Sequence, residues 1–383
     1  MENCRIIPST YGTVFIMETH HSVLFQSAED LNNIEDKTID LVVTSPPYPM
    51  IEMWDAVFID RNNEIDEYMQ KGDGCGAFEL MHRVLDRVWK ECYRVLRPGG
   101  FACINIGDAT RKINTNFRLY TNHSRITALC ESIGFQSLPP VLWRKQSNAP
   151  NKFMGSGMLP SGAYVTLEHE YILIFRKSDK RVFKNDEKEV RQRSSFFWEE
   201  RNVWFSDIWD FKGTRQALGT KQAVGAGKAL GDSKMRSRSG AFPFELAFRL
   251  IQMYSMQGDT VLDPFLGTGT TTAASIASAR NSIGVELDDN FTTTIEQSIT
   301  GSVELANQRQ RKRINDHRDF VKEYENKKNK TMKYVNGPHG LPVMTKQELK
   351  LMVPKLKKIV KREDGVYTAH HGPMNSEGFL IDF

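Results

Sequence analysis

The 383-residue chain has few cysteines and no long apolar run. Its five cysteines, at positions 4, 75, 92, 103 and 130, form no C-x-x-C pair and match neither the spacing of a metal site nor that of a disulfide framework. The sequence opens without a basic stretch followed by an apolar run, and no apolar segment is long enough to cross a bilayer. We therefore expect a reduced, cytoplasmic protein without a metal site.

The net charge is only +4, but the charges are unevenly distributed. Residues 176–238 contain 16 Lys and Arg against 9 Asp and Glu, and residues 301–383 contain 17 against 10, so each region carries +7. The rest of the chain then carries −10. Basic regions on an acidic body are typical of proteins that hold a polyanion, although such regions also occur as solvated surface.

Short apolar runs alternate with helical patterns, which predicts an α/β fold with a mostly parallel sheet. Strands are expected at 22–25, 39–43, 101–107, 140–143 and 170–175 and in the segments TVLDPF and SIGVEL; helices are expected at 78–96, 120–133 and 243–256. Periodicity fades between 178 and 240, and residues 288–330 become long, helical and basic. The tail from 331 is a lysine-rich extension with little pattern.

The segment VLDPFLGTGTT, residues 261–271, indicates a ligand site. A strand ends at Asp263, Gly267 and Gly269 allow a ligand close to the backbone, and the following helix offers free amide groups. About 20 residues later a second strand ends on Glu286, whose carboxylate can accept both hydroxyls of a ribose. The turn is neither a dinucleotide fingerprint nor a P-loop, and no lysine is placed to hold phosphates. An adenosine without phosphates is therefore favoured over ATP or NAD.

In this segment the sequence resembles the DNA amino-methyltransferases. DPFLGTGTT is similar to their S-adenosylmethionine motif, and TSPPY (44–48) resembles their catalytic motif. VLRPGGFACINIGD (95–108), LEHEYILIFRK (167–177) and FPFELAFRLIQMYSMQGDTVLDPFLGTGTT (242–271) resemble further motifs of the family. The resemblance spans about residues 20–300, with the catalytic motif before the cofactor motif, which is the permuted order of the β group.

The resemblance implies a Rossmann-like class I methyltransferase fold, S-adenosylmethionine as cofactor, double-stranded DNA as substrate and a possible cognate restriction endonuclease. It divides the chain into a catalytic half (1–177), a small target recognition region (178–240), a cofactor-binding half (241–310) and a basic C-terminal extension (311–383). The cofactor-binding residues that it implies are Asp263, Pro264, Phe265, Gly267, Gly269, Thr270, Glu286 and Ser27.

Ser27 stands where the chain departs from the family pattern. The family usually has Gly-Asp at the place where this chain has Gln26-Ser27, and the Asp lies near the cofactor adenine. Ser27 also begins a possible helix capping box with Asp30. Helix cap and adenine contact therefore both remain open.

The corner Ser45-Pro46-Pro47-Tyr48 carries the predicted catalytic residues. Proline cannot donate to a sheet, so the strand stops there, and the corner could be only a rigid turn. Together with the cofactor motif, a chemical role is favoured. The Pro46 carbonyl and the Ser45 hydroxyl can accept the two N–H groups of a base amine and free its lone pair, while Tyr48 offers a face for a flipped base.

Flanking residues are open to two interpretations each. His169-Glu170 could line the target pocket or be a polar strand end, and Trp54-Asp55 could order a loop over the base or pack locally. In the recognition region a small aromatic core and a set of basic residues that meet phosphates or guanine edges are expected. These are Trp198, Trp204, Trp209 and Phe211, and Arg191, Arg193, Arg215, Lys221, Arg236 and Arg238.

The serine at position 45 favours cytosine N4 as the target, because adenine-N6 members of the family mostly carry Asp or Asn there. Adenine N6 remains the alternative. Methylation at cytosine C5 is excluded, since it uses a cysteine after a proline and none of the five cysteines follows one. Methylation of a protein glutamine amide or an RNA amine is disfavoured by the motif order, and an inactive DNA-binding protein is disfavoured by the intact glycine turn.

Overall fold

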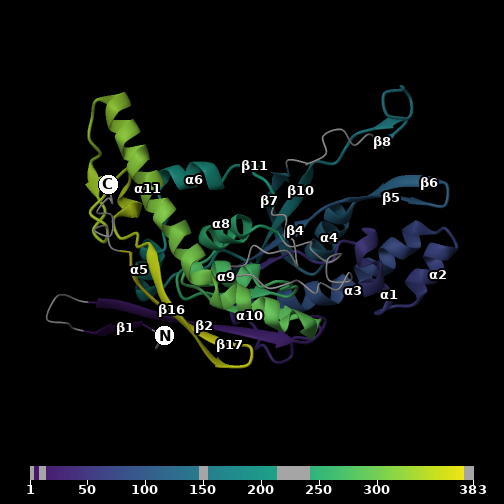
Figure 1. Cartoon of the computed structure of the whole chain (residues 1–383), viewed down its shortest axis with the longest axis horizontal. Helices are drawn as coiled ribbons and strands as arrows, with labels where there is room; N and C mark the ends of the chain where they lie inside the picture. The colour runs from purple at the N-terminus through teal and green to yellow at the C-terminus, as the bar shows by residue number, and fades with distance from the viewer. Residues whose placement is uncertain (1–3, 8–13, 146–153, 214–241, 375–383) are drawn as a thin grey trace, which may run out of the picture.

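An 11-stranded mixed sheet runs through the residues that the computed structural model describes, which are 4–7, 14–145, 154–213 and 242–374 (Figure 1). Its strands are β1 (Cys4–Ile7), β2 (Val14–Phe25), β3 (Ile39–Thr44), β4 (Leu96–Ile106), β7 (Phe135–Arg144), β10 (His169–Lys177), β11 (Ile208–Asp210), β12 (Thr260–Asp263), β13 (Asn281–Glu286), β16 (Pro354–Glu363) and β17 (Val366–Pro373). Their spatial order is β11-β7-β10-β4-β3-β12-β13-β2-β17-β16, and β1 pairs with β2.

The central strands β4, β3, β12, β13 and β2 are parallel to one another, which confirms the predicted parallel sheet. β10 is antiparallel to both β4 and β7. Parallel strands bring their carboxyl ends to one edge of the sheet, and ligands bind there in open α/β folds. The ends of β2, β3, β12 and β13 therefore meet at a single edge.

Helices cover both faces of the sheet. The helices are α1 (Asp55–Ile59), α2 (Glu64–Gln70), α3 (Gly74–Val95), α4 (Asn122–Ser132), α5 (Asn185–Arg193), α6 (Trp198–Trp204), α8 (Phe244–Tyr254), α9 (Thr270–Ala277), α10 (Thr292–Thr300) and α11 (Ser302–Lys328), with short turns η1 (Glu52–Trp54), η2 (Asp289–Phe291) and η3 (Lys346–Glu348). Val42 of β3 packs in the core below α3 and α4, whereas Leu41 and Val43 pack in the core below α8 and α9. A strand that is buried on both faces reads as a continuous apolar run, as β3 does.

The predicted helices are confirmed, with shifted ends. α3 begins at Gly74 rather than 78, because Asp73 caps it by accepting hydrogen bonds from Cys75 N (3.1 Å) and Gly76 N (2.9 Å). β2 begins at Val14 rather than 22. Its first four residues are apolar and pair with β1, but the polar residues Glu18–His21, which pair with β17, interrupt the apolar pattern before residue 22.

The prediction of little pattern after residue 331 is wrong. β16 and β17 form a hairpin, and β17 adds to the sheet beside β2. Exposed lysines at 355, 357 and 358 lie along β16, the outer strand, and protect this edge from further pairing. The predicted boundary at 310 falls inside α11, which packs on α9 and β16.

The C-terminal extension also joins the start of the predicted recognition region. Phe197, Ile314, Leu351 and Val353 belong to one buried cluster. Around it, the buried pair Arg313–Glu200 (2.6 and 2.8 Å) links α11 to α6. Three short hairpins, β5 (Ala109–Ile113) with β6 (Asn116–Tyr120), β8 (Met154–Gly155) with β9 (Ala163–Tyr164), and β14 (Tyr334–Val335) with β15 (Pro342–Val343), lie outside the sheet.

The predicted aromatic core of the recognition region is part of the main core. Trp204 and Trp209 are buried beside α8, whereas Trp198 is 40% exposed. Arg191 stacks over Phe183 (4.3 Å). Arg193 donates to Gln257 (3.2 Å). The predicted basic residues Arg215, Lys221, Arg236 and Arg238 lie outside the described residues.

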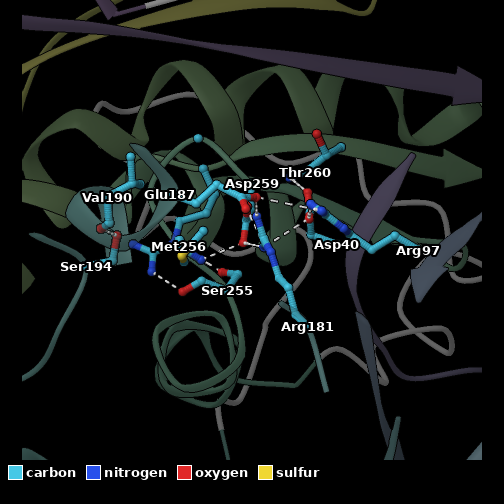
Figure 2. A network of polar contacts seen from close by, with 12 residues as sticks. Asp40, Arg97, Arg181, Glu187, Val190, Ser194, Ser255, Met256, Asp259 and Thr260 are labelled. Carbon is cyan, nitrogen blue, oxygen red and sulfur yellow. Dashed lines mark hydrogen bonds and ion pairs between the residues drawn. The ribbon is translucent and has the colours of Figure 1, made fainter. Parts of the chain in front are cut away.

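An ionic network at the amino-terminal edge of the strands holds residue 181 to the sheet (Figure 2). Arg181 pairs with Asp259 (2.9 Å), Glu187 (2.9 Å) and Asp40 (3.3 Å), and Arg97 also pairs with Asp40 (2.6 Å). Burial and the neighbouring Asp40 raise the pKa of Asp259 to about 6, against the lowering effect of Arg181. The network fixes the start of the recognition region at the edge opposite the strand ends described above.

The described parts of the chain contain no helix with the length and apolar character needed to span a membrane. They also contain no group of three or more His, Cys, Asp or Glu side chains arranged for a metal ion.

Buried histidines join the C-terminal hairpin to the sheet and predict a pH dependence of stability. Thr19 contacts His21 (2.8 Å) and His371 (2.9 Å), and burial lowers the pKa of His371 to about 3. The unfolded chain takes up this proton near pH 6.5, so stability is lost as the pH falls below 6.5, by about 1.4 kcal/mol per unit. We expect His371→Gln to lose about 2 kcal/mol less than wild type between pH 7 and pH 5, measured by urea unfolding.

The matched control is His20→Gln, because His20 is exposed on the same strand as Thr19. This variant should keep the wild-type pH dependence. An unchanged dependence in His371→Gln would contradict the assignment.

Candidate active site

A cavity of about 400 Å³ opens at the carboxyl edge of the central strands and joins the two predicted motifs. Ten of the predicted site residues line it: Ser27, Ser45, Pro46, Pro47, Tyr48, Pro264, Phe265, Gly267, Thr270 and Glu286. Asp263 and Gly269 do not line it. The catalytic corner at the end of β3 and the glycine turn after β12 are therefore two walls of one site.

The glycine turn depends on positive backbone angles. Gly267 has φ +56° and Gly269 has φ +84°, in the left-handed region that favours glycine, and Gly269 is the N-cap of α9. Glu286, at the end of β13, accepts hydrogen bonds from Gly267 N (2.8 Å) and Asp288 N (3.0 Å). Burial raises the pKa of Glu286, although these amide groups lower it. The carboxylate thus orders the turn and also faces the cavity.

Asp263 acts behind the cavity wall. Its side chain is buried and accepts hydrogen bonds from Thr44 Oγ1 (2.6 Å), Thr271 Oγ1 (2.5 Å) and Phe265 N (3.0 Å). Burial raises its pKa to about 6, against the three hydrogen bonds. Since Thr44 directly precedes Ser45, Asp263 ties the catalytic corner to the cofactor turn.

A polar cluster surrounds the catalytic corner. Tyr48 Oη donates to Glu170 Oε2 (3.0 Å), and Asn105 Nδ2 donates to both Tyr48 Oη (2.8 Å) and Glu170 Oε2 (2.7 Å). Lys145 Nζ binds the other oxygen of Glu170. Ser45 Oγ lies 3.1 Å from Tyr48 Oη. The single hydroxyl proton of Tyr48 goes to Glu170, so Ser45 is the donor in this last contact.

Burial and the Glu170 carboxylate raise the pKa of Tyr48, so the hydroxyl stays protonated. Gly107 makes room for the ring, because a Cβ there would lie 3.0 Å from Tyr48 Cε2. The position of the Tyr48 ring is thus set by the hydrogen bonds of its hydroxyl group and by the close approach of Gly107.

Glu170 and Trp54 line the cavity, whereas His169 and Asp55 do not. Asp55 instead forms two hydrogen bonds with Arg111 of β5 (2.7 and 2.6 Å). His169 packs edge-on against Tyr171.

Ser27 lines the cavity and caps no helix. No helix occurs between residues 26 and 38, all of which the structure describes, and Ser27 Oγ accepts a hydrogen bond from Glu29 N (3.3 Å) within a turn. The helix-cap interpretation is therefore wrong.

Asn105 and Lys145 are site residues that sequence reasoning missed. Asn105 is 1% exposed within a strand that is otherwise apolar in this half, and a polar group in such a place needs partners. That signal was available in FACINIG. Lys145 follows the last residue of β7, and nothing in the sequence near it marks it out.

The strand order and the site at the carboxyl edge define a Rossmann-like methyltransferase fold. Residues 39–297 match the DNA methylase family, N6_N4_Mtase, and the chain belongs to that family.

Relatives from archaea cover most of the chain. The type II methyltransferase M.MthZI of Methanothermobacter thermautotrophicus is 49% identical over 353 residues, which is 91% of this chain and 94% of that protein. The type II methyltransferase M.MjaI of Methanocaldococcus jannaschii is 49% identical over 292 residues, 73% of this chain and 91% of that protein. Among solved structures, TTHA0409 of Thermus thermophilus, assigned as a DNA modification methylase and complexed with S-adenosyl-L-methionine, has a TM-score of 0.54 and 29% identity, covering 74% of this chain and 96% of that one.

Substitutions of the two acidic residues, Glu286 and Asp263, should cause different defects. Glu286→Ala removes a charged acceptor from the cavity wall, which typically costs about 1.5–3 kcal/mol. We therefore expect roughly 10- to 100-fold weaker S-adenosylmethionine binding in calorimetry. Asp263→Ala should weaken binding too, but together with a lower unfolding temperature, because it removes the tie between β3, β12 and α9.

The control is Asp289→Ala, since Asp289 is exposed and lies outside the cavity. Wild-type affinity in Glu286→Ala would remove this residue from the ligand site.

Proposed function

We propose that the chain is a site-specific DNA methyltransferase that transfers a methyl group from S-adenosylmethionine to the exocyclic N4 amine of a cytosine in double-stranded DNA. The observation that carries the proposal is the cavity shared by the Ser45–Tyr48 corner, the glycine turn and Glu286. Membership in the DNA methylase family supplies the reaction class.

The cavity fits the cofactor. A Cβ added at Gly267 would find only Phe265 O, 4.0 Å away, so the space that a side chain would fill remains open. The Glu286 carboxylate would accept the ribose hydroxyls, and Phe265, Leu287 and Phe291 provide an apolar wall for the adenine. The turn contains no lysine or arginine side chain that could bind phosphate groups. When bound, S-adenosylmethionine supplies a methyl group carried on a positively charged sulfur.

The corner can prepare a base amine for attack. Ser45 donates a hydrogen bond to Tyr48 and accepts a long one from Asn105 (3.5 Å), so one lone pair of its oxygen would accept one N–H of the amine, and the Pro46 carbonyl would accept the other. Asn105 and Glu170 hold the Tyr48 hydroxyl and thereby fix the proton direction at Ser45. Acceptors that are fixed before the reaction need no reorganisation during it.

The choice of cytosine rests on Ser45. A hydroxyl is smaller than the Asp or Asn side chain that adenine-N6 members mostly carry, and it is uncharged. Pocket depth also contributes, because a pyrimidine places its amine closer to its sugar than a purine does. Adenine N6 is the second candidate, since the family covers both amines.

We further propose that the enzyme belongs to a restriction–modification system and protects DNA from a cognate endonuclease. M.MthZI and M.MjaI are named type II methyltransferases, which supports this role. The chain order, with β3 before β12, supports the permuted arrangement of the β group. Residues 178–240 remain the proposed target recognition region.

The variant Ser45→Ala tests the acceptor. It should bind S-adenosylmethionine normally and lose on the order of 100-fold in the rate of methyl transfer, because the lost hydrogen bond acts mainly in the transition state. Tritium transfer from labelled cofactor to DNA measures the rate. A rate close to wild type would mean that Ser45 is not an acceptor for the amine.

The identity of the methylated base is a separate prediction. DNA methylated by the wild-type enzyme, digested to nucleosides and examined by mass spectrometry, should contain N4-methylcytosine. If the digest contains N6-methyladenine and no N4-methylcytosine, the enzyme class stands and the serine argument is wrong.

A further inference from the structure

The β8–β9 hairpin presents apolar side chains to solvent. Met158 is 86% exposed, Leu159 69% and Val165 86%. Residues 154–167 contain no charged side chain. Contiguous exposed apolar residues mark an interaction site in a folded protein.

The hairpin tip has a defined structure. Ser156 N donates to Gly162 O (2.8 Å), and Ser156 Oγ donates to Leu159 O (2.6 Å). Gly155 has φ +69°, and a Cβ there would lie 2.1 Å from Gly162 O, so no other residue fits. The chain thus specifies a turn that leaves the side chains of Met158 and Leu159 exposed.

The hairpin lies between two residues of the target pocket. Lys145 precedes it and Glu170 follows it in the chain, and both line the cavity and contact each other. Tyr164 stacks on Phe117 of β6 (4.9 Å between ring centroids), which holds the hairpin beside β5 and β6. Figure 1 shows it extending beyond the body of the protein at this place.

We propose that this hairpin is a DNA wedge: Met158 and Leu159 enter the base stack at the position that the target base leaves. The inference rests on the proposed function, because a base inside a duplex reaches the Ser45 corner only after it has turned out of the stack. Removing a base exposes the faces of its neighbours, and apolar side chains on an uncharged turn can cover them. The partner is therefore duplex DNA at the methylated position.

The experiment compares paired and mismatched DNA. The methylated motif is first read by sequencing DNA treated with wild-type enzyme, and oligonucleotides are then made with the target base paired or mismatched. The double variant Met158→Ser/Leu159→Ser should lose roughly 10- to 100-fold in kcat/KM on the paired duplex, because base extrusion costs a few kcal/mol. On the mismatched duplex, where part of that cost is already met, the loss should be less than about threefold.

Val182→Ser is the matched control, since Val182 is 88% exposed and lies outside the hairpin. It should behave as wild type on both substrates, and all variants should bind S-adenosylmethionine normally. An equal loss on both duplexes, or no loss, overturns the wedge. If the wild-type enzyme itself methylates no DNA, the proposed function fails instead, which separates the two outcomes.

Discussion

The active site depends on one buried carboxylate. Asp263 accepts hydrogen bonds from Thr44, Thr271 and the Phe265 amide, so the last residue of β3, the start of α9 and the turn after β12 share a single anchor. Burial alone would favour the neutral acid, and the three donors offset that cost. Because the proposed catalytic corner begins one residue after Thr44, its position relative to the glycine turn is set by side-chain oxygen atoms as well as by the hydrogen bonds of the sheet. Asp263 itself does not line the cavity.

Ion pairs hold the amino-terminal edge of the sheet to the elements around it. There Arg181 bridges Asp40, Glu187 and Asp259, and α6 is bound to α11 by Arg313 and Glu200. The start of the proposed recognition region, the sheet and the C-terminal extension are consequently one packed unit. A change in the extension would therefore reach the recognition region through the shared cluster of Phe197, Ile314 and Leu351.

The sequence alone predicts those parts of the molecule whose signals are local. The glycine turn, the Pro-Pro corner, α3 and the parallel strands each depend on a short run of residues, and the structure contains them. The C-terminal hairpin escapes prediction because the alternation of lysines and apolar residues in β16 breaks at Lys357-Lys358, where the register shifts, and because the strand that the hairpin joins, β2, lies more than 300 residues away. Lys145 escapes for the same reason, since only the sheet order brings it to Glu170, whereas Asn105 is marked in the sequence as a polar residue within an apolar strand. A strand-end carboxylate looks the same in sequence whether it faces a ligand or, as Asp263 does, the hydroxyl groups of two threonines.

The pairing of β17 with β2 also bears on how the protein is made. Thr19 and His371 are 352 positions apart, so β2 emerges from the ribosome long before its neighbour β17 has been translated. During that time its outer edge offers unpaired N–H and C=O groups to any other strand. Late arrival of the last strand makes the nascent chain vulnerable to association with other copies. The pairing of β17 with β2, which places His371 against Thr19, closes this edge.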